Sequence, residues 1–139
     1  MLKRSEGTYG HGDDGYNVIV GGELFHGYAD HPRVLVTLNN KGLKSTAAGA
    51  YQFLASTWDD LKRKLNLPDF SPKSQDIAAQ ELIRERHALA DVADGRLAEA
   101  IAKCAPTWAS LPGAGYDQPE HTMAQLRDWY EAAGGIVED

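Results

Sequence analysis

The order of the hydrophobic patterns along the chain is the feature that most constrains its fold. Between residues 16 and 38 the apolar side chains alternate with polar ones or form short β-branched runs, which is typical of strands. From about residue 48 they recur every three or four positions, as in Leu54, Trp58 and Leu61, which places them on one helix face. Strand patterns followed by a longer helical region predict an α+β fold, mainly helical, with one small antiparallel sheet near the N-terminus.

Two glycines divide the strand-like region. Gly21 and Gly22 separate the runs 16–20 and 23–25, which is the spacing of a β-hairpin. Residues 33–38 form a predicted third strand. Because such a sheet is too short to hold a core by itself, we expect the helices to supply most of the buried surface.

Capping residues divide the helical region. Ser71 and Pro72 predict a helix start, as N-cap and first helical residue, after Pro68 has ended the preceding helix. Asp94 is predicted to be a further N-cap, and the last helix is predicted over 120–133. The side chains expected on the inward faces of these helices are Ile77, Ala78, Leu82, Ile83, Leu97, Ile101, Cys104, Met123, Leu126 and Tyr130.

Length and charge limit the class of protein. A chain of 139 residues is the size of one domain and buries roughly two-thirds of its unfolded surface, so we expect a single domain over 1–139. A net charge of −6 argues against sequence-independent binding of nucleic acid, which needs clustered cations. No apolar run approaches the ~18 residues of a membrane span, and no secretory signal is recognisable. We therefore expect a protein that is not embedded in a membrane and stays in the cytoplasm until something releases it.

The cysteine and the histidines suggest structural roles. Cys104 is the only cysteine and lies on an apolar helical stripe, so we expect a core residue rather than a nucleophile. His31, which precedes Pro32, is expected to be structural as well. The histidines are too dispersed for metal-ligand spacing, and we expect neither a metal site nor a cofactor. They are His11, His26, His31, His87 and His121.

Several segments together resemble the lambda-type phage lysozymes. They are Ser5-Glu6-Gly7-Thr8, residues 15–25, His31-Pro32-Arg33, Lys44-Ser45-Thr46, Gly49-Ala50-Tyr51-Gln52, residues 70–76 and residues 108–116. The segments occur in the order of the family and are spread over most of the chain. One of them alone would be a weak signal, whereas their combination is strong.

The resemblance implies a lysozyme-like fold, in which two lobes flank a cleft for a glycan chain. Members of the family are lytic transglycosylases, which cut the β-1,4 bond between N-acetylmuramic acid and N-acetylglucosamine in peptidoglycan. The C6 hydroxyl of the muramyl residue closes on its own anomeric carbon and leaves a 1,6-anhydro sugar. We therefore expect an endolysin of a phage or prophage that acts as a monomer on peptidoglycan glycan strands. Without a signal sequence it would need a holin to pass from the host cytoplasm to the periplasm.

By the resemblance, Glu6 matches the catalytic glutamate of the family. Cleavage of a glycosidic bond requires a proton on the leaving oxygen while positive charge develops on the sugar ring. Burial beside apolar groups would keep Glu6 protonated near neutral pH, and its carboxylate could later accept the C6 hydroxyl proton. Since the nucleophile belongs to the substrate, a second carboxylate is not required.

Four further residues are candidates for substrate binding. Tyr51 offers a flat ring to a sugar, and the amide of Gln52 offers donors and an acceptor for hydroxyl and N-acetyl groups. Tyr116 and Gln118 lie in a glycine-rich loop that resembles a mobile cleft lip. By contrast, the neighbouring Phe53, like Trp108, is expected in the core. Trp108 begins the same glycine-rich loop that contains Tyr116 and Gln118. We therefore expect this loop to contribute both a core residue and residues of the cleft lip.

Two alternatives remain open at this point. In a hydrolytic muramidase a second carboxylate would position water, and the candidates are Asp13, Asp14, Glu23 and Asp30, the first two being better explained as turn formers. In a wall-binding or virion domain the fold would persist without turnover. The shortness of the first helix favours this second alternative, because only five residues precede Glu6, and packing of Met1 and Leu2 would have to anchor them.

Overall fold

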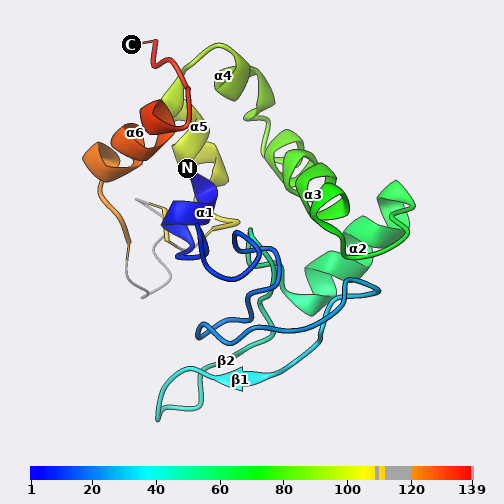
Figure 1. Ribbon diagram of the computed structural model, residues 1–139. Coiled ribbons are helices and arrows are strands. Elements are labelled where there is room, and N and C mark those ends of the chain that lie inside the picture. The colour runs from blue at the N-terminus through cyan, green and yellow to red at the C-terminus, as the bar shows by residue number, and fades with distance from the viewer. Residues whose placement is uncertain (109, 112–119, 139) are drawn as a thin grey trace. The chain divides into compact units, whose positions relative to one another are not determined.

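The computed structural model describes residues 1–108, 110, 111 and 120–138 (Figure 1). The helices are α1 (Leu2–Ser5), α2 (Ala55–Leu65), α3 (Pro72–Glu85), α4 (Leu89–Ala93), α5 (Leu97–Cys104) and α6 (Met123–Ala132), and the strands are β1 (Val36–Thr37) and β2 (Lys44–Ser45). The expected fold class, mainly helical with a small antiparallel sheet, is confirmed. The chain divides into two compact units, residues 6–79 and residues 1–5 with 80–139, which we call the N-unit and the C-unit.

The regular sheet of the N-unit is a two-stranded hairpin over residues 36–45. Val36 pairs with Ser45 and Thr37 with Lys44, and the amide of Leu38 donates to the carbonyl of Leu43 at 2.7 Å. The predicted third strand is therefore real but short. Its partner was missed, because two polar residues give no strand pattern in the sequence.

The predicted hairpin around Gly21 and Gly22 exists only as a single bridge. Val18 pairs with Leu24 in antiparallel orientation, but the runs 16–20 and 23–25 form no regular strands. The prediction was wrong in extent because adjacent loops take the remaining backbone groups: the amide of residue 20, for example, donates to the carbonyl of residue 47 at 2.9 Å. Pairing is spread over several short contacts rather than one ladder.

Helix α2 begins seven residues after the pattern suggested. Gly49 and Gln52 have positive φ angles of 85° and 53°, and this left-handed conformation does not fit a right-handed helix. The predicted apolar face is confirmed for Trp58 and Leu61, which are buried, but Leu54 precedes the helix as its N-cap and is 45% exposed, so its assignment to this face was wrong. The helix ends with Asn66 in the left-handed C-cap conformation, two residues before Pro68.

Helix α3 begins as predicted at Pro72, and the hydroxyl of Ser71 accepts the amide of Ser74 at 3.3 Å. Ala78 and Leu82 are buried as expected, but Ile77 is 40% exposed, so its assignment to the core was wrong. Helical spacing places Ile77 at the edge of the apolar face. Only the tertiary packing decides whether such an edge position is covered.

The predicted N-cap at Asp94 was also wrong. Asp94 follows α4 as its C-cap, and Arg96 is the N-cap of α5. Gly95 between them has a positive φ of 76° and separates the two helices. Cys104 is buried in α5 as expected, and burial raises the pKa of its thiol to about 11, which opposes formation of the reactive thiolate.

Helix α6 begins with a capping box that was not predicted from the sequence. The hydroxyl of Thr122 accepts the amide of Gln125 at 3.2 Å, and the side chain of Gln125 accepts the amide of Thr122 at 2.9 Å. Leu126 is fully buried as predicted, whereas Met123 is 38% exposed and lies outside the core. Tyr130 donates its hydroxyl to the carbonyl of Val92, which joins α6 to α4 within the C-unit.

Aromatic side chains form the centre of the N-unit core. Trp58 and Phe70 are fully buried and lie perpendicular, with ring centroids 4.6 Å apart. Phe53, expected in the core, is 2% exposed and packs on both rings. His31 completes the cluster with its ring centroid 5.1 Å from that of Phe70.

His31 has the structural role that the sequence suggested. Its Nε2–H donates to the carbonyl of Phe53 at 2.8 Å, and its Nδ1 accepts the amide of Arg33 at 2.9 Å. Because an amide can only donate, this arrangement requires the neutral imidazole. Burial is the largest influence and lowers the pKa of His31; the hydrogen bond to the Phe53 carbonyl raises it in part, Arg33 lowers it, and Asp30 and Asp59 raise it by less.

This arrangement predicts a loss of stability in acid. Since the pKa of His31 is lower in the folded than in the unfolded chain, its contribution is complete above the unfolded value of about 6.5 and declines as the pH falls through the folded value. One proton limits the slope to about 1.4 kcal/mol per pH unit. Urea unfolding of the parent and of His31→Gln at pH 7 and pH 5.5 measures this contribution. The variant should be less stable at pH 7 but should lose less on acidification. Equal losses in both proteins would contradict the prediction.

In the described part of the chain, no helix is both long and apolar enough to cross a lipid bilayer.

Candidate active site

The segment that carries Glu6 is fixed within the N-unit by its neighbour Thr8. Glu6 is half-buried and follows α1 directly, and Gly7 turns the chain with a positive φ of 78°. The hydroxyl of Thr8, which is 1% exposed, donates to the carbonyl of Ala50 at 2.7 Å. A buried hydrogen bond thus ties the Glu6 segment to the segment of Tyr51.

Gly15 packs closely against this anchor. A Cβ atom at position 15 would lie 2.7 Å from the Cβ and 2.8 Å from the carbonyl oxygen of Thr8, and Gly15 has a positive φ of 92°. No other residue type fits this contact without displacing Thr8. The sequence alone gives no signal for this close contact.

The residue before Glu6 is fixed within the C-unit. The hydroxyl oxygen of Ser5 lies 2.7 Å from that of Ser110, and the carbonyl of Ser5 accepts Nε2–H of His121 at 2.9 Å. Ser5 is buried, whereas Met1 and Leu2 are only half-buried. The one-turn helix α1 is therefore anchored through Ser5, not chiefly through Met1 and Leu2 as the sequence suggested.

The turn that carries Tyr51 and Gln52 is held from α3 by Gln75. The side-chain oxygen of Gln75 accepts the amide of Ala50 at 2.9 Å, and its Nε2 donates to the carbonyls of Tyr16 at 3.0 Å and Phe70 at 2.9 Å. Gln75 is 0% exposed, and these three partners fix the orientation of its side-chain amide. In the sequence, Gln75 lies in a segment that resembles the family, but no signal there predicts this supporting role.

A Cβ atom at Gly49 would overlap the side-chain oxygen of Gln75 and approach Phe70 to 2.9 Å. Gly49 is thus required by close approach as well as by its positive φ. The close approach and the positive φ explain why the Gly49-to-Gln52 segment, which matches the family, begins with glycine.

Tyr51 is bound to Asp76, the residue after Gln75. The hydroxyl of Tyr51 donates to Asp76 Oδ1 at 2.7 Å, and the hydroxyl of Tyr16 donates to the same oxygen at 2.8 Å. Burial and the Asp76 carboxylate both raise the pKa of Tyr51 above its usual range, so the phenol stays neutral. The ring orientation of Tyr51 is fixed, and its hydroxyl proton is already committed.

Both side-chain donors of Gln52 also form hydrogen bonds within the protein. Its Nε2 donates to the carbonyls of Gly49 at 2.9 Å and Val18 at 3.2 Å. We expected from the sequence that both donors and the acceptor would be open to a ligand. With both amide hydrogens donated to backbone oxygens, the side-chain oxygen is the group that remains for an incoming N–H or O–H donor.

Three of the four candidates for a second carboxylate have structural partners. Asp13 accepts the hydroxyl of Tyr28 at 2.8 Å, Asp14 accepts the amide of residue 10 at 2.8 Å, and Asp30 forms an ion pair with Arg33 at 3.2 Å. Asp14 has a positive φ of 51°, as expected of a turn former. Glu23 is exposed.

Of the remaining aromatic and polar residues considered from the sequence, one lies in the core and two lie outside the described residues. Trp108 is 3% exposed and belongs to the core, as expected. Tyr116 and Gln118 lie outside the described residues and stay predictions. Among the residues that the structure does describe, no group of histidine, cysteine, aspartate and glutamate side chains could hold a metal ion.

Comparison with known proteins places the chain in a family. A family model described as Endolysin matches residues 1–137. The endolysin of Escherichia phage lambda is 52% identical over 143 aligned residues, covering 100% of this chain and 90% of that protein. The endolysin of Escherichia phage P2 is 48% identical over 148 residues, covering 98% and 90%.

Solved structures agree. A structure of bacteriophage lambda lysozyme complexed with a chitohexasaccharide matches with a TM-score of 0.95 and 52% identity, covering 99% of this chain and 91% of that one. A second structure of the lambda lysozyme matches with a TM-score of 0.90 and 51% identity, with the same coverage. The chain therefore belongs to the endolysin family and is an enzyme of cell-wall degradation with the fold of the lambda lysozyme.

Proposed function

We propose that this endolysin is a peptidoglycan lytic transglycosylase, formed by one catalytic domain over residues 1–139, with Glu6 as its catalytic acid. The observation that carries the proposal is the buried hydrogen bond from Thr8 to Ala50. It joins the segment of the proposed acid to the segment of the proposed sugar-binding residues Tyr51 and Gln52. A catalytic group must be held in a fixed position relative to the bound substrate, and this bond supplies such a constraint.

In the proposed reaction Glu6 donates its proton to the glycosidic oxygen between N-acetylmuramic acid and N-acetylglucosamine. The bond from the anomeric carbon to that oxygen breaks, and positive charge develops on the muramyl ring. The C6 hydroxyl of the same residue then attacks the anomeric carbon, and its proton passes to the Glu6 carboxylate. The acid is regenerated, no water is consumed, and the new end is a 1,6-anhydro sugar.

The partners of the other carboxylates support transglycosylation over hydrolysis. Asp13 and Asp14 are bound to Tyr28 and to a backbone amide, and Asp30 is bound to a cation. A hydrolase needs a second carboxylate free to activate water or attack the sugar. Exposed Glu23 is the remaining candidate for the alternative, a hydrolytic muramidase.

We propose Tyr51 and Gln52 as substrate-binding residues, together with Tyr116 and Gln118. With its hydroxyl held by Asp76, Tyr51 offers mainly its ring face to a sugar, and Gln52 offers its side-chain oxygen to a donor such as an acetamido N–H. The chitohexasaccharide bound to the lambda lysozyme supports binding of a glycan here. The enzyme would act as a monomer on glycan strands, crossing from host cytoplasm to periplasm through a holin.

Mass spectrometry of muropeptides released from purified Gram-negative sacculi tests the reaction. We expect products that end in anhydro-muramic acid. Reducing muramic ends, one water heavier, would establish hydrolysis and direct attention to Glu23. Binding to the sacculi without any release would support a wall-binding domain instead.

A further inference from the structure

The hairpin over residues 36–45 carries two exposed lysines, Lys41 and Lys44. Residues 33–45 contain Arg33, Lys41 and Lys44 and no acidic residue, a net charge of +3 in a chain of −6. Arg33 pairs with Asp30 and Asp59. Lys41 and Lys44 are exposed and form no ion pair with any described residue.

Most other cations of the N-unit have a partner. Lys62 lies 3.5 Å from Asp30, Arg63 lies 2.6 Å from Asp60, and Lys64 also has an interaction. Besides the hairpin lysines, only Lys73 on α3 is exposed without an ion pair to a described residue. Two unpaired cations within four residues therefore distinguish the hairpin from the rest of this unit.

The hairpin holds these lysines in a defined arrangement. The side-chain oxygen of Asn39 accepts the amides of Lys41 at 2.9 Å and Leu43 at 3.1 Å, which orders the turn. Lys44 pairs with Thr37 and shares its face of the hairpin. Val36 lies on the opposite face, and a Cβ atom at Gly21 would lie 3.9 Å from its side chain.

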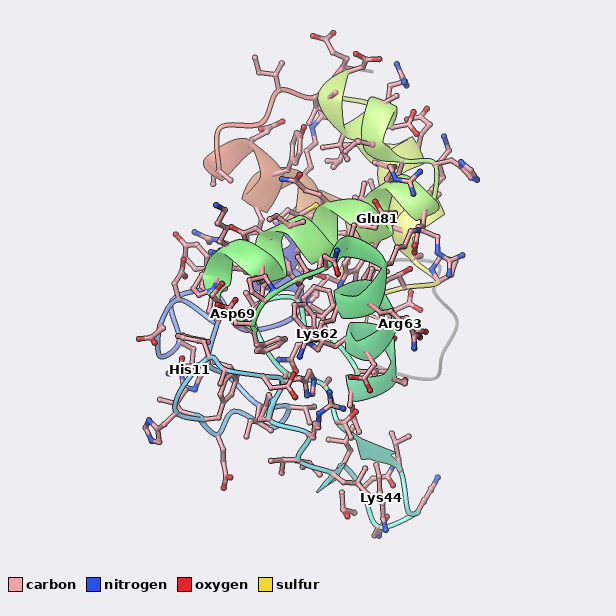
Figure 2. The ribbon with its side chains drawn as sticks, turned by 90° about the vertical axis from the view of Figure 1, so that its right-hand side faces the viewer. His11, Lys44, Lys62, Arg63, Asp69 and Glu81 are labelled. Carbon is pink, nitrogen blue, oxygen red and sulfur yellow. The ribbon has the colours of Figure 1, made fainter. Side chains whose placement is uncertain are left out.

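Lys44 therefore lies on the face directed away from Gly21 and the loops of the same unit. Figure 2 shows Lys44 on the outer part of the hairpin, away from Lys62 and Arg63 on α2. Within the described part of this unit, the ammonium group of Lys44 has no acidic partner and is accessible to a ligand.

The hairpin is also continuous with the proposed glycan site. Residue 47 accepts the amide of residue 20, and Gly49 donates its amide to Val18 at 2.8 Å, so the chain after β2 passes directly into the Gly49-to-Gln52 turn. Only four residues separate Lys44 from Gly49. A polymer bound at Tyr51 and Gln52 would extend past this hairpin.

We propose that Lys41 and Lys44 bind the carboxylate groups of the stem peptides that branch from the muramic acid residues of peptidoglycan. This inference rests on the proposed function and assigns a specificity to the same site. In a strand that bears stem peptides the lactyl carboxyl of muramic acid is bound in an amide, so the free carboxylates belong to the peptides, and these match two exposed ammonium groups. Substrate with free stem-peptide carboxylates is therefore bound more tightly than the same substrate with these carboxylates converted to amides.

A membrane surface fits the hairpin less well. Leu38 and Leu43 are 39% and 42% exposed beside the lysines, as in some membrane-binding hairpins. However, two lysines add little affinity for anionic lipids, and surface attachment usually needs a larger basic cluster or a second signal. Continuity with the proposed glycan site favours peptidoglycan.

Calorimetric titration with soluble glycan chains tests the proposal. The chains are used with their stem-peptide carboxylates free and after these carboxylates have been converted to amides, and the protein carries Glu6→Gln so that binding is measured without cleavage. Replacing Lys41 and Lys44 with glutamine should weaken binding of the chains with free carboxylates by roughly threefold to tenfold. Binding of the amidated chains should not change, and about 1 M salt should remove the difference.

Lys73→Gln is the matched control, because it removes one exposed, unpaired cation elsewhere in the N-unit. The proposal is overturned if the double variant binds both chains like its parent, if it loses affinity for both equally, or if Lys73→Gln has the same effect. Binding to vesicles of phosphatidylglycerol that depends on Lys41 and Lys44, without dependence on stem peptides, would indicate a membrane surface instead. These outcomes are independent of the proposed function, which is judged from the anhydro ends released by the active enzyme.

Discussion

Glu6→Gln should reduce release of muropeptides from sacculi by at least about 10²- to 10⁴-fold, the usual contribution of a general acid. The amide cannot donate a proton to the glycosidic oxygen, although it keeps the size and much of the hydrogen-bonding capacity of the carboxyl group. Glu6 is half-buried and its segment is held by Thr8, so the substitution should leave the fold intact. Turbidity loss of sacculi measures the activity, and thermal unfolding measures the fold.

Two comparisons make this result specific. Glu99→Gln removes an exposed carboxylate from α5 and should retain parental activity. Glu23→Gln removes the remaining candidate for a second carboxylate and should also be nearly neutral if the enzyme is a transglycosylase. Activity of Glu6→Gln close to that of the parent would refute Glu6 as the acid. A loss in both Glu6→Gln and Glu23→Gln would instead favour a two-carboxylate hydrolase.

Gln75→Leu should destabilise the enzyme by roughly 3–5 kcal/mol, since three buried backbone groups lose their partner. These groups are the amide of Ala50 and the carbonyls of Tyr16 and Phe70. Leucine fills a similar volume but can neither donate nor accept, so most of the cost comes from unsatisfied polar groups and not from a cavity. The melting temperature should fall by roughly 10–20 °C, measured by thermal unfolding.

The matched control is Gln80→Leu, an exposed position on the same helix. It should change the free energy of unfolding by no more than about 0.5 kcal/mol. Activity of Gln75→Leu should also fall below what the loss of folded protein explains, because Gln75 holds the turn of Tyr51 and Gln52. If Gln75→Leu melted within about 2 °C of its parent, the network around Gln75 would not stabilise the site as described.

The sequence alone determined the fold class, the family and most of the helices. Helical spacing identified α2 and α3 because their apolar faces are continuous, and Ser71 with Pro72 marked the start of α3 correctly. Thr8 and the Gly49-to-Gln52 turn were already recognisable in the sequence as matches to the family. Helical spacing and capping residues are local features of the chain, so they can be recognised without knowledge of the tertiary structure.

The tertiary structure decided how the site is supported. Gln75 lies 25 residues from Ala50 and 59 from Tyr16, and Asp76 joins two tyrosines that are 35 residues apart in the chain. No spacing rule connects such residues, because their contacts exist only after the backbone has folded. For the same reason the sequence could not show that the donors of Gln52 are used internally or that Ser5 anchors α1.

The errors in the predicted elements have the same physical origin. Asp94 has the residue type of an N-cap but closes α4, and Ile77 has the spacing of a core residue but remains exposed. Intrinsic preference selects among a few local conformations with differences of about 1 kcal/mol or less, and tertiary packing easily outweighs them. Sequence therefore determined which fold and which family this chain belongs to, and tertiary contacts decided which polar groups of the proposed site are already bound within the protein.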